Sequence, residues 1–291
     1  MTDRDDKSKA DIIPKSTPLK TNEHEEEDCQ ITKHLPSKAP KKKRNILFSK
    51  EEKLNISSNQ MLTDESMSLA QKYLKEQFPD FSGLFDTSLM KLNMSDIISK
   101  TTKYIQIINL GNLHWVCASS TSTSGIRIHN IFDSLSGNRI SNELKRVVAE
   151  YSMCREVNLQ LKIQPVQQQN NGVDCGVFAI AFATSLAHGN DPCTAAYNVS
   201  LMRSHLIKCL QQKKMELFPT TPKRIRRCIP KKFTVPIYCH CRLPYFENKD
   251  KMVQCSQCNE WFHFKCETIH GSKNMAKVTW QCQECVKKNG L

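Results

Sequence analysis

The sequence predicts a mixed fold of helices and strands: an α+β or α/β domain over residues 46 to about 215, then a small cysteine-rich module over 236–287. In the larger segment, short runs rich in β-branched and aromatic residues alternate with amphipathic helical patterns, which is typical of a single domain built on a sheet. In the smaller segment, cysteines recur in closely spaced pairs. Apolar residues make up 39% of the 291-residue chain and charged residues 24%, as in a globular protein with disordered parts.

Local patterns predict each element of the larger domain in order. Thr63, followed by an acidic first turn, opens a helix whose apolar residues include Met67 and Leu74. Runs rich in β-formers predict strands over 104–110, 114–118, 126–132 and 159–163. Helical patterns predict further helices over 142–151, 175–186 and 197–211. The helix over 175–186 is apolar on every side, which predicts that it is buried.

The N-terminal segment 1–45 is charge-rich, contains no aromatic residue and shows no apolar period, so we expect a disordered tail. Its basic run PKKKR, residues 40–44, resembles a monopartite nuclear localisation signal and predicts a nuclear protein. A solvated charge run without a targeting role is the alternative. The N-terminus is polar and no stretch approaches 18 consecutive apolar residues, so neither a secretory signal nor a membrane span is expected.

The net charge of +13 is concentrated toward the C-terminus, since residues 1–45, 46–212 and 213–291 contribute +2, +1 and +10. A second basic cluster, over 223–227, lies in a segment 216–235 that we interpret as an interdomain linker. Excess positive charge there favours an acidic partner such as nucleic acid or the nucleosome surface, and makes the linker a candidate for contact with DNA.

Cys175 has the sequence context of a nucleophile. It begins the apolar helix pattern directly after a polar loop, 169–174, whose Gly172 favours a tight turn. The thiolate is the reactive form of cysteine, and the unpaired N–H groups and dipole of a helix N-terminus stabilise that anion. Loop N–H groups and the Gln169 side chain can stabilise an oxyanion beside the sulfur. A buried structural cysteine on a core helix is the alternative.

A cysteine nucleophile needs a base, and two residues at strand ends can supply it. His114 begins a predicted strand, and Asp133 follows the end of the next strand along the chain. Antiparallel pairing of these two strands would bring the side chains together. The imidazole would then take the thiol proton and later protonate the leaving amine, while the carboxylate fixes the tautomer of the ring.

These residues resemble the motifs of a known family. His-Trp at 114–115, Asp-Ser at 133–134 and Gln-x-Asn-Gly-x-Asp-Cys-Gly at 169–176 are similar to motifs of the sentrin/SUMO-specific proteases. These cysteine proteases process and remove ubiquitin-like proteins and are related to the adenovirus protease. The resemblance covers roughly residues 45–215 and implies a papain-like, adenain-like α+β fold. It also implies that ubiquitin-like protein conjugates are the substrates, cleaved after a C-terminal Gly-Gly.

The resemblance implies roles for individual residues. Carried over position by position, the catalytic residues are His114, Asp133, Cys175 and, for the oxyanion hole, Gln169. The implied substrate-binding residues are Trp115 and Met61, which would form the two walls around the thin Gly-Gly tail. Met61 stands where the family usually has Trp, so this wall would be less rigid. The pattern is most similar to the transposon-associated branch of the family.

Eight cysteine and histidine residues of the C-terminal module form four pairs: Cys239 and Cys241, Cys255 and Cys258, His263 and Cys266, and Cys282 and Cys285. Each pair lies on a short knuckle that lets two side chains reach one ion, and eight ligands fill two tetrahedral Zn²⁺ sites. Their order resembles the PHD finger, in which the pairs interleave. That resemblance implies one site from the first and third pairs and another from the second and fourth. A RING-type domain or a redox cluster is the alternative.

Apolar side chains of the module resemble a second feature of PHD fingers. Tyr238, Tyr245, Met252 and Trp261 occupy positions similar to the cage that binds trimethyl-lysine of the histone H3 tail. Facing aromatic surfaces attract a quaternary ammonium through cation–π contact. The resemblance therefore implies the histone H3 tail or the nucleosome as a partner. Use of these aromatics only as a small core is the alternative.

Three hypotheses follow for the whole chain. The first is a nuclear cysteine peptidase or isopeptidase of SUMO-type conjugates that the finger directs to chromatin. The second is a chromatin adaptor whose protease fold is inactive and only binds a partner. The third is a mobile-element-derived protease with another substrate.

Overall fold

The structure is a computed structural model that describes residues 47–87, 103–123, 126–137, 140–152, 157–222, 229–247, 249–267 and 279–289. The expected N-terminal tail over 1–45, its basic run and the basic cluster over 223–227 lie outside these residues. Among the helices of the described ranges, none is both long enough and apolar enough to cross a membrane.

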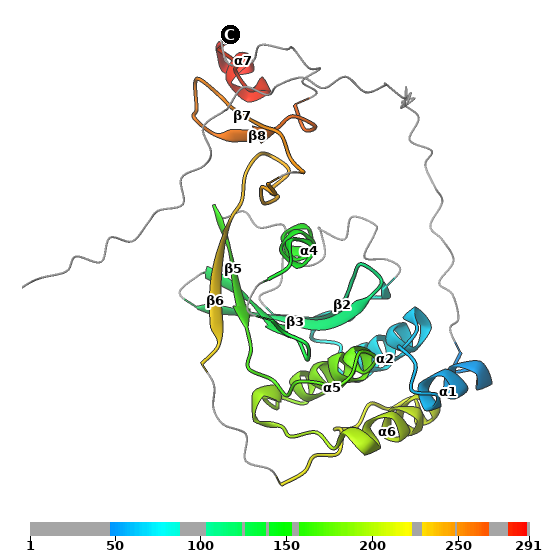
Figure 1. Cartoon of the computed structure of the whole chain (residues 1–291). Coiled ribbons are helices and arrows are strands. Elements are labelled where there is room, and N and C mark those ends of the chain that lie inside the picture. The colour runs from blue at the N-terminus through cyan, green and yellow to red at the C-terminus, as the bar shows by residue number, and fades with distance from the viewer. Residues whose placement is uncertain are drawn as a thin grey trace, which may run out of the picture. The chain divides into compact units, whose positions relative to one another are not determined.

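The larger domain is built on a six-stranded sheet whose strands follow chain order, β1-β2-β3-β4-β5-β6 (Figure 1). The strands are β1 Ser82–Gly83, β2 Tyr104–Leu110, β3 His114–Thr123, β4 Ile126–Phe132, β5 Asn158–Ile163 and β6 Lys231–Pro236. β1 pairs parallel with β2 and β4 pairs parallel with β5, while the other neighbours are antiparallel. The antiparallel pairing of β3 with β4 is the one that the expected His114–Asp133 contact requires.

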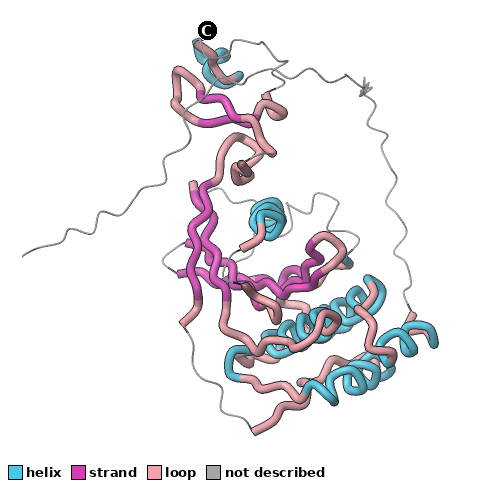
Figure 2. Tube along the Cα trace, in the orientation of Figure 1, coloured by secondary structure: helices cyan, strands magenta, loops and turns pink. Residues whose placement is uncertain are grey.

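Helices cover both faces of this sheet (Figure 2). They are α1 Lys50–Ser57, α2 Asp64–Gln77, α4 Asn142–Ser152, α5 Cys175–Ala187 and α6 Val199–Gln212. Because side chains alternate along a strand, Ile107 and Cys117 belong to the core shared with α1, α2, α5 and α6, whereas Ile108 and Val116 belong to the core under α4. Nearly every residue of α5 is buried, as its apolar sequence predicts.

The first helix, α1, is absent from the sequence-based prediction because its pattern is mostly polar. Its buried side chains are Glu52 and Ile56. Glu52 is nonetheless structural, since its carboxylate accepts the hydroxyl of Thr63 at 2.7 Å and that of Ser66, at the start of α2. A buried carboxylate that binds the next helix start is a tertiary contact, which no local period reveals.

The segment expected as a linker, 216–235, differs from that expectation. Its last five residues belong to β6, which pairs with β5 so that Val235 lies opposite Leu159 and Phe233 opposite Leu161. Phe233 and Val235 alternate with polar residues over only one period, and the surrounding basic residues favoured a linker, so the sequence did not predict this strand. Earlier in the segment, Phe218 is buried in the core shared with α5. The larger domain therefore extends beyond residue 215.

The C-terminal module holds a two-stranded antiparallel sheet, β7 Met252–Gln254 and β8 Trp261–His263, and a short helix, α7 Gln283–Asn289. Within its described parts, 236–247, 249–267 and 279–287, the cluster of buried residues consists of Phe262 and four cysteines. Trp280 packs against this cluster, with its ring 5.5 Å from that of Phe262 in an edge-to-face contact. Because the described residues make so few apolar contacts, we expect metal ligation to supply most of the stabilisation.

The module continues directly from the sheet of the larger domain. Ile237, one residue after β6, is buried in the core under α4, and its N–H donates to the carbonyl of Val157 at 2.8 Å. Tyr238 then bridges to Leu243, which packs against the same core. The first pair of cysteines therefore lies in a loop whose two ends are anchored on the larger domain.

Candidate active site and metal centres

The side chains of His114 and Asp133 meet where β3 begins and β4 ends. Nε2 of His114 lies 2.7 Å from Oδ1 of Asp133, and the two side chains are 20% and 15% exposed. The strand register explains the contact. Phe132, the last residue of β4, lies opposite Cys117, and because the strands are antiparallel Asp133 continues toward His114 at the start of β3. The same carboxylate oxygen accepts the backbone N–H of Leu135 at 2.8 Å, which restrains its orientation.

Cys175 is the first residue of α5 and lies beside His114. Its side chain is buried, with 1% of the residue exposed. Burial lowers the pKa of His114, but hydrogen bonds to Asp133 and Cys175 and the charges of those groups raise it more, to about 9. The imidazole is therefore mainly protonated at neutral pH. Since Nε2 faces Asp133, Nδ1 is the ring nitrogen left for the thiol.

Gln169 lies on the loop before Cys175, and its amide is held at both ends. Oε1 accepts the hydroxyl of Ser134 at 2.6 Å, and Nε2 donates to the carbonyl of Asn171 at 2.6 Å. The backbone N–H of Gln169 donates to the carbonyl of Ser134 at 2.7 Å. An amide nitrogen carries two hydrogens, so the bond to Asn171 leaves a second N–H that can bind an oxyanion.

Trp115 and Met61, the two expected walls, pack against the core that contains Cys175. Trp115 is 3% exposed and Met61 is half-buried. Leu62 lies close to Gly176, where an added Cβ would be 3.0 Å from the Cβ of Leu62. The glycine thus lets the segment before α2 approach the start of α5. In the folded chain Trp115 is therefore a buried core residue.

Arg203 is a site residue that the sequence-based prediction missed. Its Nη2 lies 2.7 Å from Oδ1 of Asp174, the residue before Cys175. Asp174 is the N-cap residue of α5, but its side chain makes no capping hydrogen bond. An arginine 29 positions from its partner has no signal in a single sequence, because their contact depends on how α6 packs.

The eight predicted metal ligands form two groups of four. One group is Cys239, Cys241, His263 and Cys266, the other is Cys255, Cys258, Cys282 and Cys285, and the ligand atoms within each lie within 4.8 Å of one another. Sulfurs of a tetrahedral zinc site are about 3.8 Å apart, given Zn–S bonds of about 2.3 Å. Donor types and spacing therefore fit zinc. His240, between the first two cysteines, is exposed and lies 3.3 Å from Glu267.

The four residues expected to form a methyl-lysine cage are all half-buried. Met252 and Trp261 share one face of the small sheet, because Gln254, two residues from Met252, is opposite Trp261. Burial and the charge of Glu260, the residue before Trp261, raise the pKa of Tyr238. Tyr238 also packs against the buried cysteines, as the small-core alternative requires.

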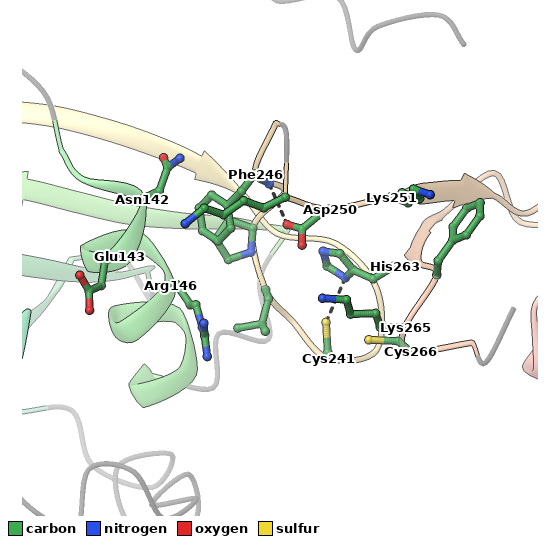
Figure 3. Close-up of a pocket in the computed structure, with 14 residues that line it drawn as sticks. Asn142, Glu143, Arg146, Cys241, Phe246, Asp250, Lys251, His263, Lys265 and Cys266 are labelled. Carbon is green, nitrogen blue, oxygen red and sulfur yellow. Dashed lines mark hydrogen bonds between the residues drawn. The ribbon is translucent and has the colours of Figure 1, made fainter. Parts of the chain in front are cut away.

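A cavity of about 860 Å³ is lined by α4 and by the finger (Figure 3). Its residues include Glu143 and Arg146 of α4, and Cys241 and His263 of the first ligand group, whose Sγ and Nδ1 atoms are 3.2 Å apart. No residue of the His114, Asp133 and Cys175 cluster lines it, so this cavity is separate from the candidate active site.

Comparison with known proteins identifies both segments. The profile of the Ulp1 protease family, C-terminal catalytic domain, matches residues 60–225, and that of the PHD-finger matches 239–285. The chain is 37% identical over 57 residues to lysine-specific demethylase phf2 of Danio rerio. It is 42% identical over 53 residues to chromatin remodeling protein SHL of Arabidopsis thaliana. The two matches cover 20% and 18% of this chain but only 5% and 22% of those relatives.

Solved structures are similar to the larger domain. SUMO protease Ulp1 with its catalytic cysteine oxidised to a sulfenic acid is 20% identical, with 58% of this chain and 86% of that chain covered and a TM-score of 0.46. The effector protein XopD of Xanthomonas campestris bound to ubiquitin is 15% identical, with 51% and 91% covered and a TM-score of 0.38. The catalytic-domain profile spans more than half of the chain. The chain therefore belongs to the Ulp1 protease family, a family of cysteine peptidases, and carries a PHD finger.

Proposed function

We propose that the chain is a cysteine peptidase or isopeptidase that cleaves SUMO-type ubiquitin-like conjugates after a C-terminal Gly-Gly, with His114, Asp133 and Cys175 as the catalytic residues. The observation that carries the proposal is the contact of the His114 imidazole with Asp133, at 2.7 Å, beside the buried thiol of Cys175, which helps to raise the pKa of that imidazole. Membership of the Ulp1 protease family supports the chemistry. Met61 and Trp115 are proposed to border the substrate tail, since both pack against the core beside the thiol.

The reaction follows from these positions. The proton of the Cys175 thiol is already held at Nδ1 of the protonated His114, so Cys175 attacks the carbonyl carbon of the last glycine as a thiolate. The resulting oxyanion accepts an N–H of Gln169. His114 then gives the proton to the leaving amine as the C–N bond breaks, which leaves a thioester on Cys175. Water, deprotonated by the same imidazole, attacks the thioester, and the free carboxylate and the thiol are released.

The finger is proposed to hold two Zn²⁺ ions, one in each ligand group, and to bind methyl-lysine of the histone H3 tail through Tyr238, Tyr245, Met252 and Trp261. The fit of donor types and spacing supports the ions. Zinc supplies cross-links between distant parts of the chain and takes no part in peptide cleavage. The matched demethylase and chromatin remodeling protein support a chromatin partner and a nuclear location.

A panel of ubiquitin-like proteins that carry a C-terminal electrophile tests the peptidase proposal. We expect at least one member to form a covalent adduct with the wild type, because the thiolate attacks the electrophile placed at the scissile carbonyl. Cys175→Ala should form none, while Cys193→Ala, which removes a half-buried thiol outside the site, should react like the wild type. Intact mass measures the adduct. If no member of the panel reacts with the wild type, or if Cys175→Ala still forms the adduct, the proposed peptidase activity at Cys175 is excluded.

Trp261→Ala tests the histone proposal. Loss of one cage wall should weaken binding of a trimethyl-lysine H3 peptide by about 1–2 kcal/mol, roughly 5- to 30-fold, and leave the weaker binding of the unmethylated peptide unchanged. Calorimetric titration measures both affinities, and the zinc content of the variant shows whether the finger remains folded. Cys175→Ala, outside the finger, should bind the peptide like the wild type. Equal losses for both peptides would contradict a methyl-lysine cage at Trp261.

A further inference from the structure

The loop before the nucleophile, residues 169–174, ends in a carboxylate whose position is not explained by helix capping. Asp174 is the N-cap residue of α5 without a capping bond. Instead, Oδ2 accepts Nδ2 of Asn171 at 2.6 Å, and Oδ1 accepts Nε and Nη2 of Arg203 at 2.9 and 2.7 Å. The side chains of Asp174 and Arg203 are only 9% and 12% exposed. Burial of two charges has a desolvation cost, so their place beside the nucleophile requires another explanation.

The same guanidinium also binds the segment that carries Met61. Nη1 of Arg203 donates to the carbonyl of Ile56 at 3.0 Å, and Nη2 donates to the carbonyls of Gln60 at 2.9 Å and Val173 at 3.3 Å. Gln60 directly precedes Met61, and Val173 belongs to the loop 169–174. One side chain of α6 therefore ties the proposed wall segment to the loop that presents the nucleophile.

The connection continues to the proposed oxyanion residue. Oδ1 of Asn171 accepts the N–H groups of Val173 and Asp174, both at 3.0 Å, and the carbonyl of Asn171 accepts Nε2 of Gln169. Hydrogen bonds thus run without a break from Arg203 through Asp174 and Asn171 to Gln169. A shift of the guanidinium would be transmitted to the amide that faces the reacting carbonyl.

We propose that Arg203 is a positioning residue, which holds the loop 169–174 against the Met61 segment at the spacing that a Gly-Gly tail requires. The inference rests on the proposed function. Arginine suits this role because its planar guanidinium offers five donors in fixed directions. Lysine carries the same charge on a single ammonium group, so it cannot donate hydrogen bonds to Asp174 and to the carbonyls of Ile56 and Gln60 at the same time in these directions.

Arg203→Lys, assayed with two thiol reagents, tests the inference. Iodoacetamide is small and reports the reactivity that His114 and Asp133 confer on Cys175, whereas the ubiquitin-like electrophile that labels the wild type also needs an aligned tail site. We expect the protein probe to react about 10- to 100-fold more slowly, as for a displacement near 1 Å. The iodoacetamide rate at Cys175 and its pH profile, followed by peptide mass spectrometry, should stay within about twofold.

Two further variants make the comparison decisive. Arg146→Lys, a matched control whose guanidinium pairs with Glu150 at the surface, should react like the wild type with both reagents. Asp174→Asn keeps the side-chain shape but weakens the two hydrogen bonds from the Arg203 guanidinium. It should therefore lower the rate of reaction with the protein probe and not with iodoacetamide, and it provides this test even if Arg203→Lys fails to fold.

Other results overturn the inference. An unchanged rate with the protein probe excludes a positioning role. Equal losses with both reagents, in proportion to the folded fraction measured by circular dichroism, make Arg203 only structural. A wild type that reacts with iodoacetamide at Cys175 but with no protein probe overturns the proposed function, and the inference falls with it.

Discussion

Replacement of Asp133 by Asn is expected to lower kcat by about 10⁴-fold while the chain stays folded. Asn keeps the shape of the side chain but removes the charge that stabilises the protonated imidazole of His114, and its amide can hold the wrong tautomer. Turnover of the conjugate that the adduct panel identifies measures the effect. Asp80→Asn, which replaces an exposed carboxylate after α2, should leave kcat unchanged. Wild-type turnover in Asp133→Asn would exclude this carboxylate from the catalytic residues.

The same substitution should alter two pH profiles. The pKa of His114 is raised to about 9 in the folded chain, so wild-type activity should fall as the pH rises through that value and the imidazole loses its proton. In Asp133→Asn this alkaline limb should move to lower pH. Protonated His114 also stabilises the fold below its ordinary pKa of 6.5, and that contribution is lost as the pH rises toward 9. The variant should therefore lose more free energy of unfolding at pH 6 than at pH 10.

Removal of zinc should have the largest effect on stability, and it should fall on the finger. Among the residues of the finger that the structure describes, Phe262 is the one member of the buried cluster that is not a proposed ligand. Apparent binding free energies of structural zinc in finger peptides are about 10–16 kcal/mol, far more than so few apolar contacts supply. A chelator or Cys258→Ser should therefore unfold the finger. The emission of Trp280, which packs on Phe262, provides the measurement.

Metal analysis provides the matching stoichiometry. Two zinc ions per chain are expected for the wild type and for Cys193→Ser, whose thiol belongs to neither ligand group. Cys258→Ser should retain fewer than two. A finger that keeps its native tryptophan emission after complete chelation would show that the clusters are not structural zinc sites.

The parts of the fold that sequence reasoning predicted are those with a strong local pattern. The run from Tyr104 to Leu110 and the apolar segment after Cys175 are a strand and a buried helix as expected, because their periods are long enough to be read alone. His114 and Asp133 could be proposed as partners because they lie at the two ends of consecutive strands, and the observed antiparallel register brings them together. The proposed metal ligands were predicted from spacing, which reflects the geometry of a knuckle, and the structure brings them together in two groups of four.

The missed features depend on contacts between distant segments. Glu52 looks like an ordinary surface residue until α2 packs beside it. Arg203 contacts Asp174 only because α6 lies against the loop before Cys175. Trp115, expected to bind the substrate tail, is almost completely buried in the core. Pairing of β6 with β5 joins residues some 70 positions apart, at Gln160 and Thr234, and no local period encodes such a partner.

The sixth strand has a practical consequence for anyone who separates the peptidase from the finger. A chain truncated at residue 225, where the family match ends, would leave β5 as an edge strand with unpaired N–H and C=O groups. Leu159 and Leu161 would lose the cover of Val235 and Phe233 at the same time. Exposed edges of this kind pair with other chains, so the shortened protein should aggregate unless the cut is placed after Ile237, which keeps β6 and its anchor on Val157.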